Sequence, residues 1–266
     1  MDQLIVSLLV TIIDIYIVIL FVRMFAAESE RYDAVFGMIY KATDPVVTPL
    51  GTAFRARGMN LAPLLVIFVL LLFKGMVLGS IPWALQSFAD RLFQLYVLII
   101  IIISGFREYY INPIASFGQR LVNPIRAVAA SFSRHVVTVN LLSVLLLIIL
   151  HTVVTLILLN FRTELTSSAV GSPVMIKAAV IHSLELIVNL TGFFMIVIII
   201  NALMSWVSPD PTNPVVQLIT LISAPIIDPL RRVIPPVGGM IDISPIIAII
   251  VLQVMNAIGH GILARL

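Results

Sequence analysis

The chain has 266 residues, of which 61% are hydrophobic and 11% charged, with a formal net charge of +3. Soluble domains are about half apolar and a quarter charged, so this composition excludes an ordinary soluble protein and predicts a polytopic membrane protein. The sequence contains no Cys, which excludes disulfides, thiolate catalysis and iron–sulfur ligation by this chain.

Six apolar runs approach the length of about 20 residues that crosses a bilayer. We expect them to form membrane spans at residues 4–23, 61–78, 88–106, 141–160, 184–207 and 243–263. Asp2 precedes the first run and Arg23 follows it, which reverses the charge order of a secretory signal peptide. The first run is therefore expected to remain as an anchor.

The basic residues are distributed unevenly between the connections. Eleven Lys and Arg residues lie in the connections after the first, third and fifth runs, and five lie on the opposite side. Basic residues near span ends resist translocation. We therefore expect the three long connections to face the cytoplasm and both termini to face away from it.

The last long connection, residues 205–246, is rich in proline. Asn213 can cap a helix that begins at Pro214, and this helix is expected to stop at Pro225 because proline lacks the N–H that continues a helix. A second short helix is expected at 226–233, and residues 235–239 are expected to turn the chain back. The second helix contains Asp228, Pro229, Arg231 and Arg232. This pattern predicts an amphipathic hairpin in the headgroup region.

The same pattern occurs three times in the sequence. A shift of 101 residues places Asn112, Pro113 and Pro124 on Asn213, Pro214 and Pro225. A shift of 180 places DPVVTPL on APIIDPL, and a two-residue adjustment places NLAPL on DISPI, which contains Asp242 and Pro245. We therefore predict three tandem repeats, at 1–80, 88–160 and 184–266. The predicted fold is an all-α membrane protein of six transmembrane helices, in which each repeat is helix, interfacial hairpin and helix.

Asp14 and Lys74 are ionisable residues inside predicted spans. Such groups are costly in a bilayer, so they usually face a partner or a cavity. The two residues are expected at similar depths and can form an ion pair that fixes two helices. A snorkelling Lys74 and a proton or cation pathway are the alternatives.

Further polar residues recur in the second helix of each repeat. His151 aligns with Gln253, and Lys74 aligns with Asn256. Hydrogen bonding between helices is favoured over a ligand pathway. Ligation of a haem b by His151 with His182 or His260 is conceivable but disfavoured. The chain has no Walker loop, GxGxxG, GxSxG or HExxH motif, so we expect a non-enzymatic protein without a cofactor or metal.

The arginines of the hairpins are expected to lie near anionic lipids on the cytoplasmic side, where each contributes about 1 kcal/mol. They suit anchoring, and they also suit a docking platform for a membrane protein partner. Nucleic-acid binding would need a denser basic run with stacking aromatic residues, which the sequence lacks.

The segment SPDPTNPVVQLITLISAPIIDPLRRVIPPVGG, followed by IDISPIIAIIVLQ, resembles the signature of the YggT (YlmG) family of bacterial membrane proteins. The resemblance implies a bacterial cytoplasmic (inner) membrane and a link to osmotic tolerance. It also implies an accessory or organising role in the assembly of other membrane components. The alternative hypothesis is a small ion or solute transporter that uses Asp14, Lys74, His151 and Gln253.

Overall fold

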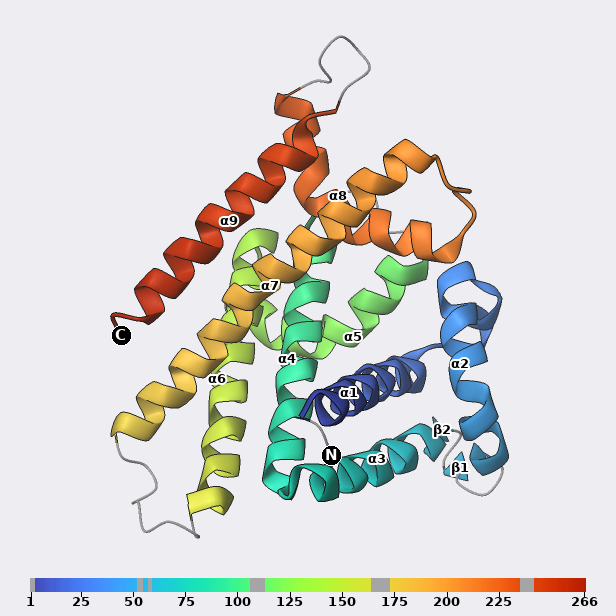
Figure 1. Ribbon diagram of the computed structural model, residues 1–266, viewed down its shortest axis with the longest axis vertical. Coiled ribbons are helices and arrows are strands. Elements are labelled where there is room, and N and C mark those ends of the chain that lie inside the picture. Colours follow the sequence, from blue (N-terminus) through green and yellow to red (C-terminus); the bar gives the residue numbers. More distant parts are fainter. Residues whose placement is uncertain (1–2, 52–54, 57–58, 106–112, 164–172, 235–241) are drawn as a thin grey trace. The chain divides into compact units, whose positions relative to one another are not determined.

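The computed structural model describes residues 1–266 except 1–2, 52–54, 57–58, 106–112, 164–172 and 235–241, and the predicted turn at 235–239 lies outside the described residues. Within the described residues the chain is almost entirely helical (Figure 1). Its elements are α1 (Gln3–Phe25), the 3₁₀ helix η1 (Glu28–Tyr32), α2 (Ala34–Gly51), β1 (Arg55–Ala56), β2 (Met59–Asn60), α3 (Ala62–Leu78), α4 (Ile81–Gly105), α5 (Pro113–Ala130), α6 (Val136–Thr163), α7 (Pro173–Val207), α8 (Pro214–Val233) and α9 (Ser244–Leu263). The two-residue strands β1 and β2 pair antiparallel.

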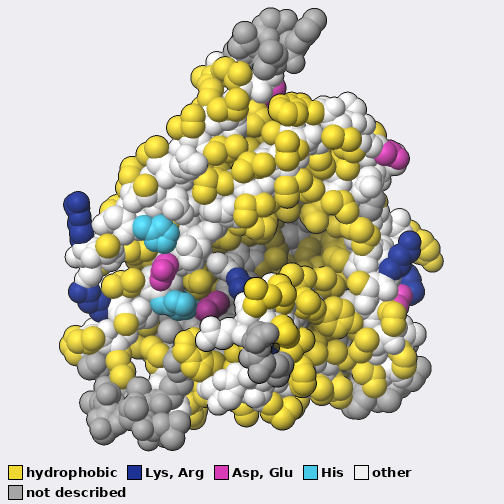
Figure 2. Space-filling view, viewed as in Figure 1, with side chains coloured by type: hydrophobic (Ala, Val, Ile, Leu, Met, Phe, Trp, Pro, Cys, Tyr) yellow, Lys and Arg dark blue, Asp and Glu magenta, His cyan; other side chains and the backbone are white. Residues whose placement is uncertain are grey.

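Five of the described helices, α1, α4, α6, α7 and α9, are long and apolar enough to cross a membrane. The sixth predicted span, α3, is an apolar helix of 17 residues, about 26 Å long at the rise of an α-helix. Hydrophobic side chains cover much of the surface that Figure 2 shows, as expected for a surface that contacts lipid. The prediction of an all-α membrane protein is confirmed.

Three helices begin at least five residues earlier than predicted, and one of them is α6, which starts at Val136 rather than at residue 141. α4 starts at Ile81 rather than at residue 88, because Gly79, with φ of 68°, ends α3 in the left-handed conformation. The Ser80 N–H donates to the Gly75 carbonyl at 2.9 Å and closes this turn. α7 starts at Pro173 rather than at residue 184, so the polar approach to the fifth span is part of one helix of 35 residues.

The predicted helix break at Pro225 is wrong, because α8 continues through Pro225 and Pro229 to Val233. α2 likewise contains Pro45 and Pro49. A proline removes one hydrogen bond of a helix, but tertiary packing can outweigh that loss. In α8 the packing comes from Ile227, which is 1% exposed in a hydrophobic cluster. The interfacial segment of this repeat is therefore one long helix and not a hairpin of two short ones.

The described chain divides into two compact units. The first contains Met1–Phe93 and Val153–Ile176, and the second contains Gln94–Thr152 and Lys177–Leu266. In the first unit α1 packs against α3, and α2 packs against both. In the second unit α8 packs against α9. One hydrophobic cluster of the second unit contains Phe194, Ile198, Ile227, Ala248 and Leu252.

Candidate functional site

The first unit contains a buried ion pair between two membrane helices. The Lys74 ammonium on α3 donates hydrogen bonds to the Asp14 carboxylate on α1 and to the Ser87 hydroxyl on α4. Lys74 is 0% exposed and Asp14 is 6% exposed. The structure therefore brings together the two residues whose depths suggested a pair, and the snorkelling alternative for Lys74 is wrong.

A second cation lies beside this pair. The Arg91 Nε is 4.0 Å from the other oxygen of the Asp14 carboxylate, and its side chain is 51% exposed. The carboxylate thus faces one buried and one half-exposed cation. Such a group can hold helices together, and it also has the composition of a proton or cation relay.

His151, on α6, takes part in a hydrogen-bond cluster of the second unit. Its Nδ1 lies 2.8 Å from the Ser183 hydroxyl on α7, and that hydroxyl donates to the Ala179 carbonyl at 2.9 Å. Because a Ser hydroxyl has one proton, Nδ1 of His151 is then the donor. The His151 and His182 rings are 5.8 Å apart. A structural metal site usually has four ligands, so these two imidazoles would supply only half of such a set.

The two polar residues predicted in the last span differ in their surroundings, although they are only three residues apart on α9. The Asn256 amide donates to the Thr191 hydroxyl on α7 at 2.8 Å. Gln253 is exposed on the surface of the helix. The structure therefore does not gather Gln253 with the other candidate polar residues.

A polar link between two apolar helices is present in the first and third predicted repeats, and a similar link joins the two apolar helices of the middle region. Lys74 bonds to Asp14, and Asn256 bonds to Thr191. Gln86, which precedes the predicted middle repeat of 88–160 by two residues, donates from its amide on α4 to the Thr155 hydroxyl on α6 at 3.0 Å. Sequence reasoning missed Gln86, Thr155 and Thr191, although Thr155 aligns one residue from Asn256 under the repeat shift. That alignment was a signal for Thr155, whereas the sequence carries no comparable signal for Gln86 or Thr191.

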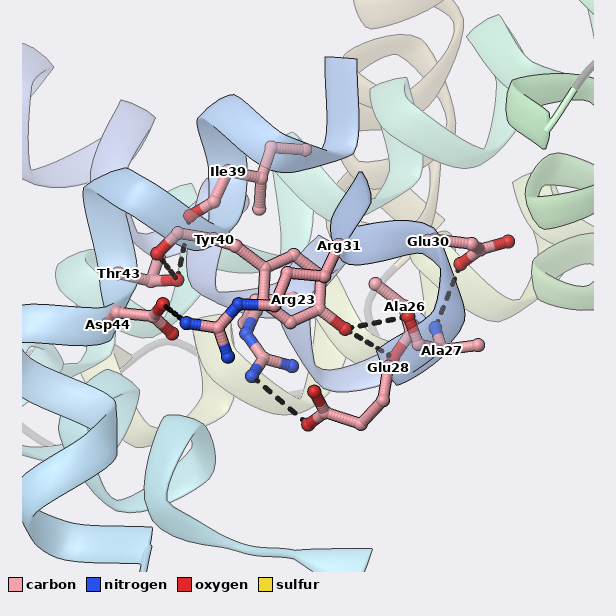
Figure 3. A network of polar contacts seen from close by, with 10 residues as sticks. All are labelled: Arg23, Ala26, Ala27, Glu28, Glu30, Arg31, Ile39, Tyr40, Thr43 and Asp44. Carbon is pink, nitrogen blue, oxygen red and sulfur yellow. Dashed lines mark hydrogen bonds and ion pairs between the residues drawn. The ribbon is translucent and has the colours of Figure 1, made fainter. Parts of the chain in front are cut away.

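Figure 3 shows how the interfacial helix of the first repeat is fixed to its span. The Arg23 guanidinium lies 3.7 Å from the centre of the Tyr40 ring, and the Arg31 guanidinium lies 5.5 Å from it. Arg31 also bonds to Asp44 on α2. The Tyr40 hydroxyl donates to the Ala27 carbonyl at 2.7 Å. Burial raises the pKa of Tyr40, so its hydroxyl keeps the proton that it donates.

The third repeat fixes its interfacial helix differently. The Asn213 side chain accepts the Val215 N–H at 2.9 Å, which caps α8 as predicted. At the other end of α8, the Arg231 Nε donates to the Asp242 carboxylate at 2.7 Å. Asp228 lies 3.7 Å from Arg231, and Arg232 is exposed.

Asp242 has a second function at the start of α9, two residues before the helix begins. It accepts the Ser244 N–H at 2.9 Å, and Pro245 follows in the first turn of that helix. Burial raises the pKa of Asp242, but the hydrogen bonds from Arg231 and Ser244 outweigh burial, so the pKa lies below its ordinary value. The carboxylate is therefore charged at neutral pH and joins the end of α8 to the start of α9.

Comparison with known proteins gives relatives in three bacteria. The chain is 30% identical to an uncharacterised protein of Pseudomonas aeruginosa over 170 residues, which are 62% of this chain and 81% of the relative. It is 27% identical to an uncharacterised protein of Vibrio alginolyticus over 176 residues, covering 63% and 88% of the two chains. It is 38% identical over 60 residues to the uncharacterised protein YggT of Escherichia coli K12, covering 23% and 31%. No solved structure matches the chain.

The family comparison agrees with the repeats at the two ends of the chain. The CCB3/YggT family matches residues 3–81 and 180–263, which correspond to the first and third predicted repeats. The match leaves out residues 82–179, so the middle repeat stays a prediction from the sequence. Two copies of the family's unit, together with the relatives, confirm the resemblance. The chain belongs to the CCB3/YggT family of membrane proteins.

Proposed function

We propose that the protein is a non-enzymatic organiser of the bacterial inner membrane, which assists the assembly of other membrane components by binding a partner transmembrane helix along α9. The observation that carries this proposal is the exposed amide of Gln253 in the middle of an apolar helix. An amide that faces lipid lacks hydrogen-bond partners, whereas a neighbouring helix can supply them. Gln253 is therefore a natural contact for another membrane protein.

The surface around Gln253 suits close helix approach. Ala257 and Gly261 follow at intervals of four residues and are exposed on the same strip of α9. A Cβ added at Gly261 would meet no atom within 4 Å, so this glycine is not needed for packing inside the described chain. Small residues at this spacing favour helix association in membranes. One amide and two small residues form a compact docking strip.

The interior polar residues support an organising role over transport. Lys74, His151 and Asn256 each bond to a neighbouring helix of their own unit. Polar groups used in this way hold helices together. Gln253, which the transport hypothesis needs along an internal path, is exposed on α9.

Photocrosslinking in native membranes tests the docking strip. A photoreactive residue at Ala257 should crosslink a specific membrane protein, and Gln253→Leu should reduce that product several-fold. The matched control places the photoreactive residue at Val251, which is exposed on another face of α9. Equal amounts of crosslinked product from positions 251 and 257 would contradict the proposal. Crosslinking of Ala257 to a second copy of this chain alone would also contradict it.

The buried pair of Asp14 and Lys74, with Arg91 beside it, favours ion or solute transport as the second candidate function. Under this alternative, the protein itself rather than a partner would carry out the osmotic role that the family resemblance implies. Flux measurements on reconstituted vesicles decide between the two. Asp14→Asn and Lys74→Met should leave flux unchanged under the organising proposal and abolish it under the transport proposal.

The proposed orientation has its own test. In this orientation both termini lie outside the cytoplasm. The long connections lie inside it, where the arginines of these connections contact anionic lipids. Thr212→Cys is then expected to react with a membrane-impermeant reagent only after the membrane is opened, and no other Cys interferes because the chain has none. Labelling from outside intact cells would reverse the topology.

A further inference from the structure

The second unit contains a cavity of about 640 Å³ where α7 ends, α8 passes and α9 begins. Its lining includes Ser205, Trp206, Thr220, Arg231, Asp242 and Ile246. Two apolar helices end here beside an amphipathic helix, so the cavity lies at the depth of the lipid headgroups. Its volume is that of an ordinary small-molecule site, for which the range is about 300–1,000 Å³.

The polar part of the lining offers one charge of each sign. The Arg231 Nε and the Asp242 Oδ2 are 2.7 Å apart, and their side chains are 46% and 27% exposed. An arginine has five N–H donors and a carboxylate accepts about four hydrogen bonds, so both groups retain capacity for a ligand. The Ser205 hydroxyl donates to the Ala202 carbonyl at 2.6 Å, which leaves its oxygen as an acceptor.

The rest of the lining suits the glycerol and first acyl carbons of a lipid. Ile246 and Pro245 of α9 supply apolar surface. Trp206 is 84% exposed at the end of α7, a position that tryptophan favours at membrane interfaces. The lining thus offers both a charged pair and apolar surface to a single ligand.

We infer that this cavity binds one phospholipid whose headgroup carries a primary ammonium, as in phosphatidylethanolamine, with its phosphate on Arg231 and its ammonium on Asp242 and Ser205. A headgroup with both charges matches a lining with both charges. The quaternary ammonium of phosphatidylcholine has no N–H to donate, and phosphatidylglycerol has no cation for Asp242. This inference does not depend on the proposed organising function.

Lipid binding to the purified, delipidated full-length protein tests the site. In native mass spectrometry, phosphatidylethanolamine should bind about tenfold more tightly than phosphatidylcholine, the difference expected for a charge-assisted hydrogen bond. Arg231→Gln should weaken the binding of both lipids. Asp242→Asn should abolish the preference between them. Asp228→Asn is the matched control, because it removes a carboxylate near Arg231 that does not line the cavity.

A second measurement needs no variant. Successive N-methylation of phosphatidylethanolamine removes ammonium N–H groups while the charge stays, so the affinity of the wild-type protein should fall with each methyl group and most at the last. Equal affinities along this series would overturn the inference. Tighter binding of phosphatidylglycerol would also overturn it, because it would indicate attraction of arginines to any anionic lipid.

Discussion

The first and third repeats contain the same three elements but join their membrane helices by different means. In the first, α1 and α3 are linked by the charged pair of Asp14 and Lys74. In the third, α7 and α9 are linked by the neutral pair of Thr191 and Asn256. Both links involve the same level of the second helix, since Lys74 and Asn256 align under the repeat shift.

A second difference accompanies the first. Gly259 of α9 lies so close to α7 that an added Cβ would be 2.8 Å from Val188, whereas the aligned residue of the first repeat is Val77. At this level the third repeat packs the Val188 side chain against a glycine, whereas the first repeat uses a charged pair. The comparison teaches that one helix pair can be closed by two chemistries, and these respond differently to substitution.

The largest effect is expected from breaking the charged pair on one side. Asp14→Leu leaves the buried Lys74 ammonium without its carboxylate, which should cost about 3–5 kcal/mol of unfolding free energy. Asp14→Leu combined with Lys74→Met should recover most of this loss. Equilibrium unfolding in mixed micelles measures both. A double variant no more stable than the single one would show that the pair is not the source of the loss.

Filling the close contact of the third repeat should have the next largest effect. Gly259→Ala forces α7 and α9 apart and should cost about 1–3 kcal/mol. Gly261→Ala is the control, since its Cβ would meet open space. The same unfolding assay compares the two. Equal stabilities would show that α7 and α9 are not tightly packed at Gly259.

A smaller effect is expected from the neutral link. Thr191→Val removes the acceptor of the Asn256 amide, and hydrogen bonds of this kind within membranes contribute about 0.6 kcal/mol on average. The loss should therefore be several times smaller than that of Asp14→Leu. A comparable loss would remove the distinction between the charged and neutral links.

The smallest effect concerns the joint between α8 and α9 and depends on pH. The pKa of Asp242 is lower in the folded protein than its ordinary value. The stabilisation of the folded protein by this carboxylate is therefore complete above the ordinary Asp pKa of about 3.9, and it is lost as the pH falls through the pKa of the folded protein. Melting temperatures of the wild type and Asp242→Asn should differ at neutral pH and converge in acid. A difference that persists at low pH would exclude the carboxylate as its cause.

Much of the fold follows from the sequence because hydropathy and proline spacing are one-dimensional signals. The apolar runs fixed where the membrane helices lie, and the shift of DPVVTPL onto APIIDPL located the interfacial segments. The depths of Asp14 and Lys74 also follow from counting residues along two helices. The family was recognisable from the last repeat alone.

Other features were decided only by the tertiary structure. α8 continues through Pro225 because Ile227 is buried, and local sequence patterns do not predict that burial. The same is true of the lateral positions of polar residues. Hydropathy places Gln253 and Asn256 at nearly the same depth, but one is exposed and the other bonds to Thr191. Depth is determined by position along the chain, whereas the partner of a side chain is determined by how each helix is rotated against its neighbours, and packing alone sets that rotation.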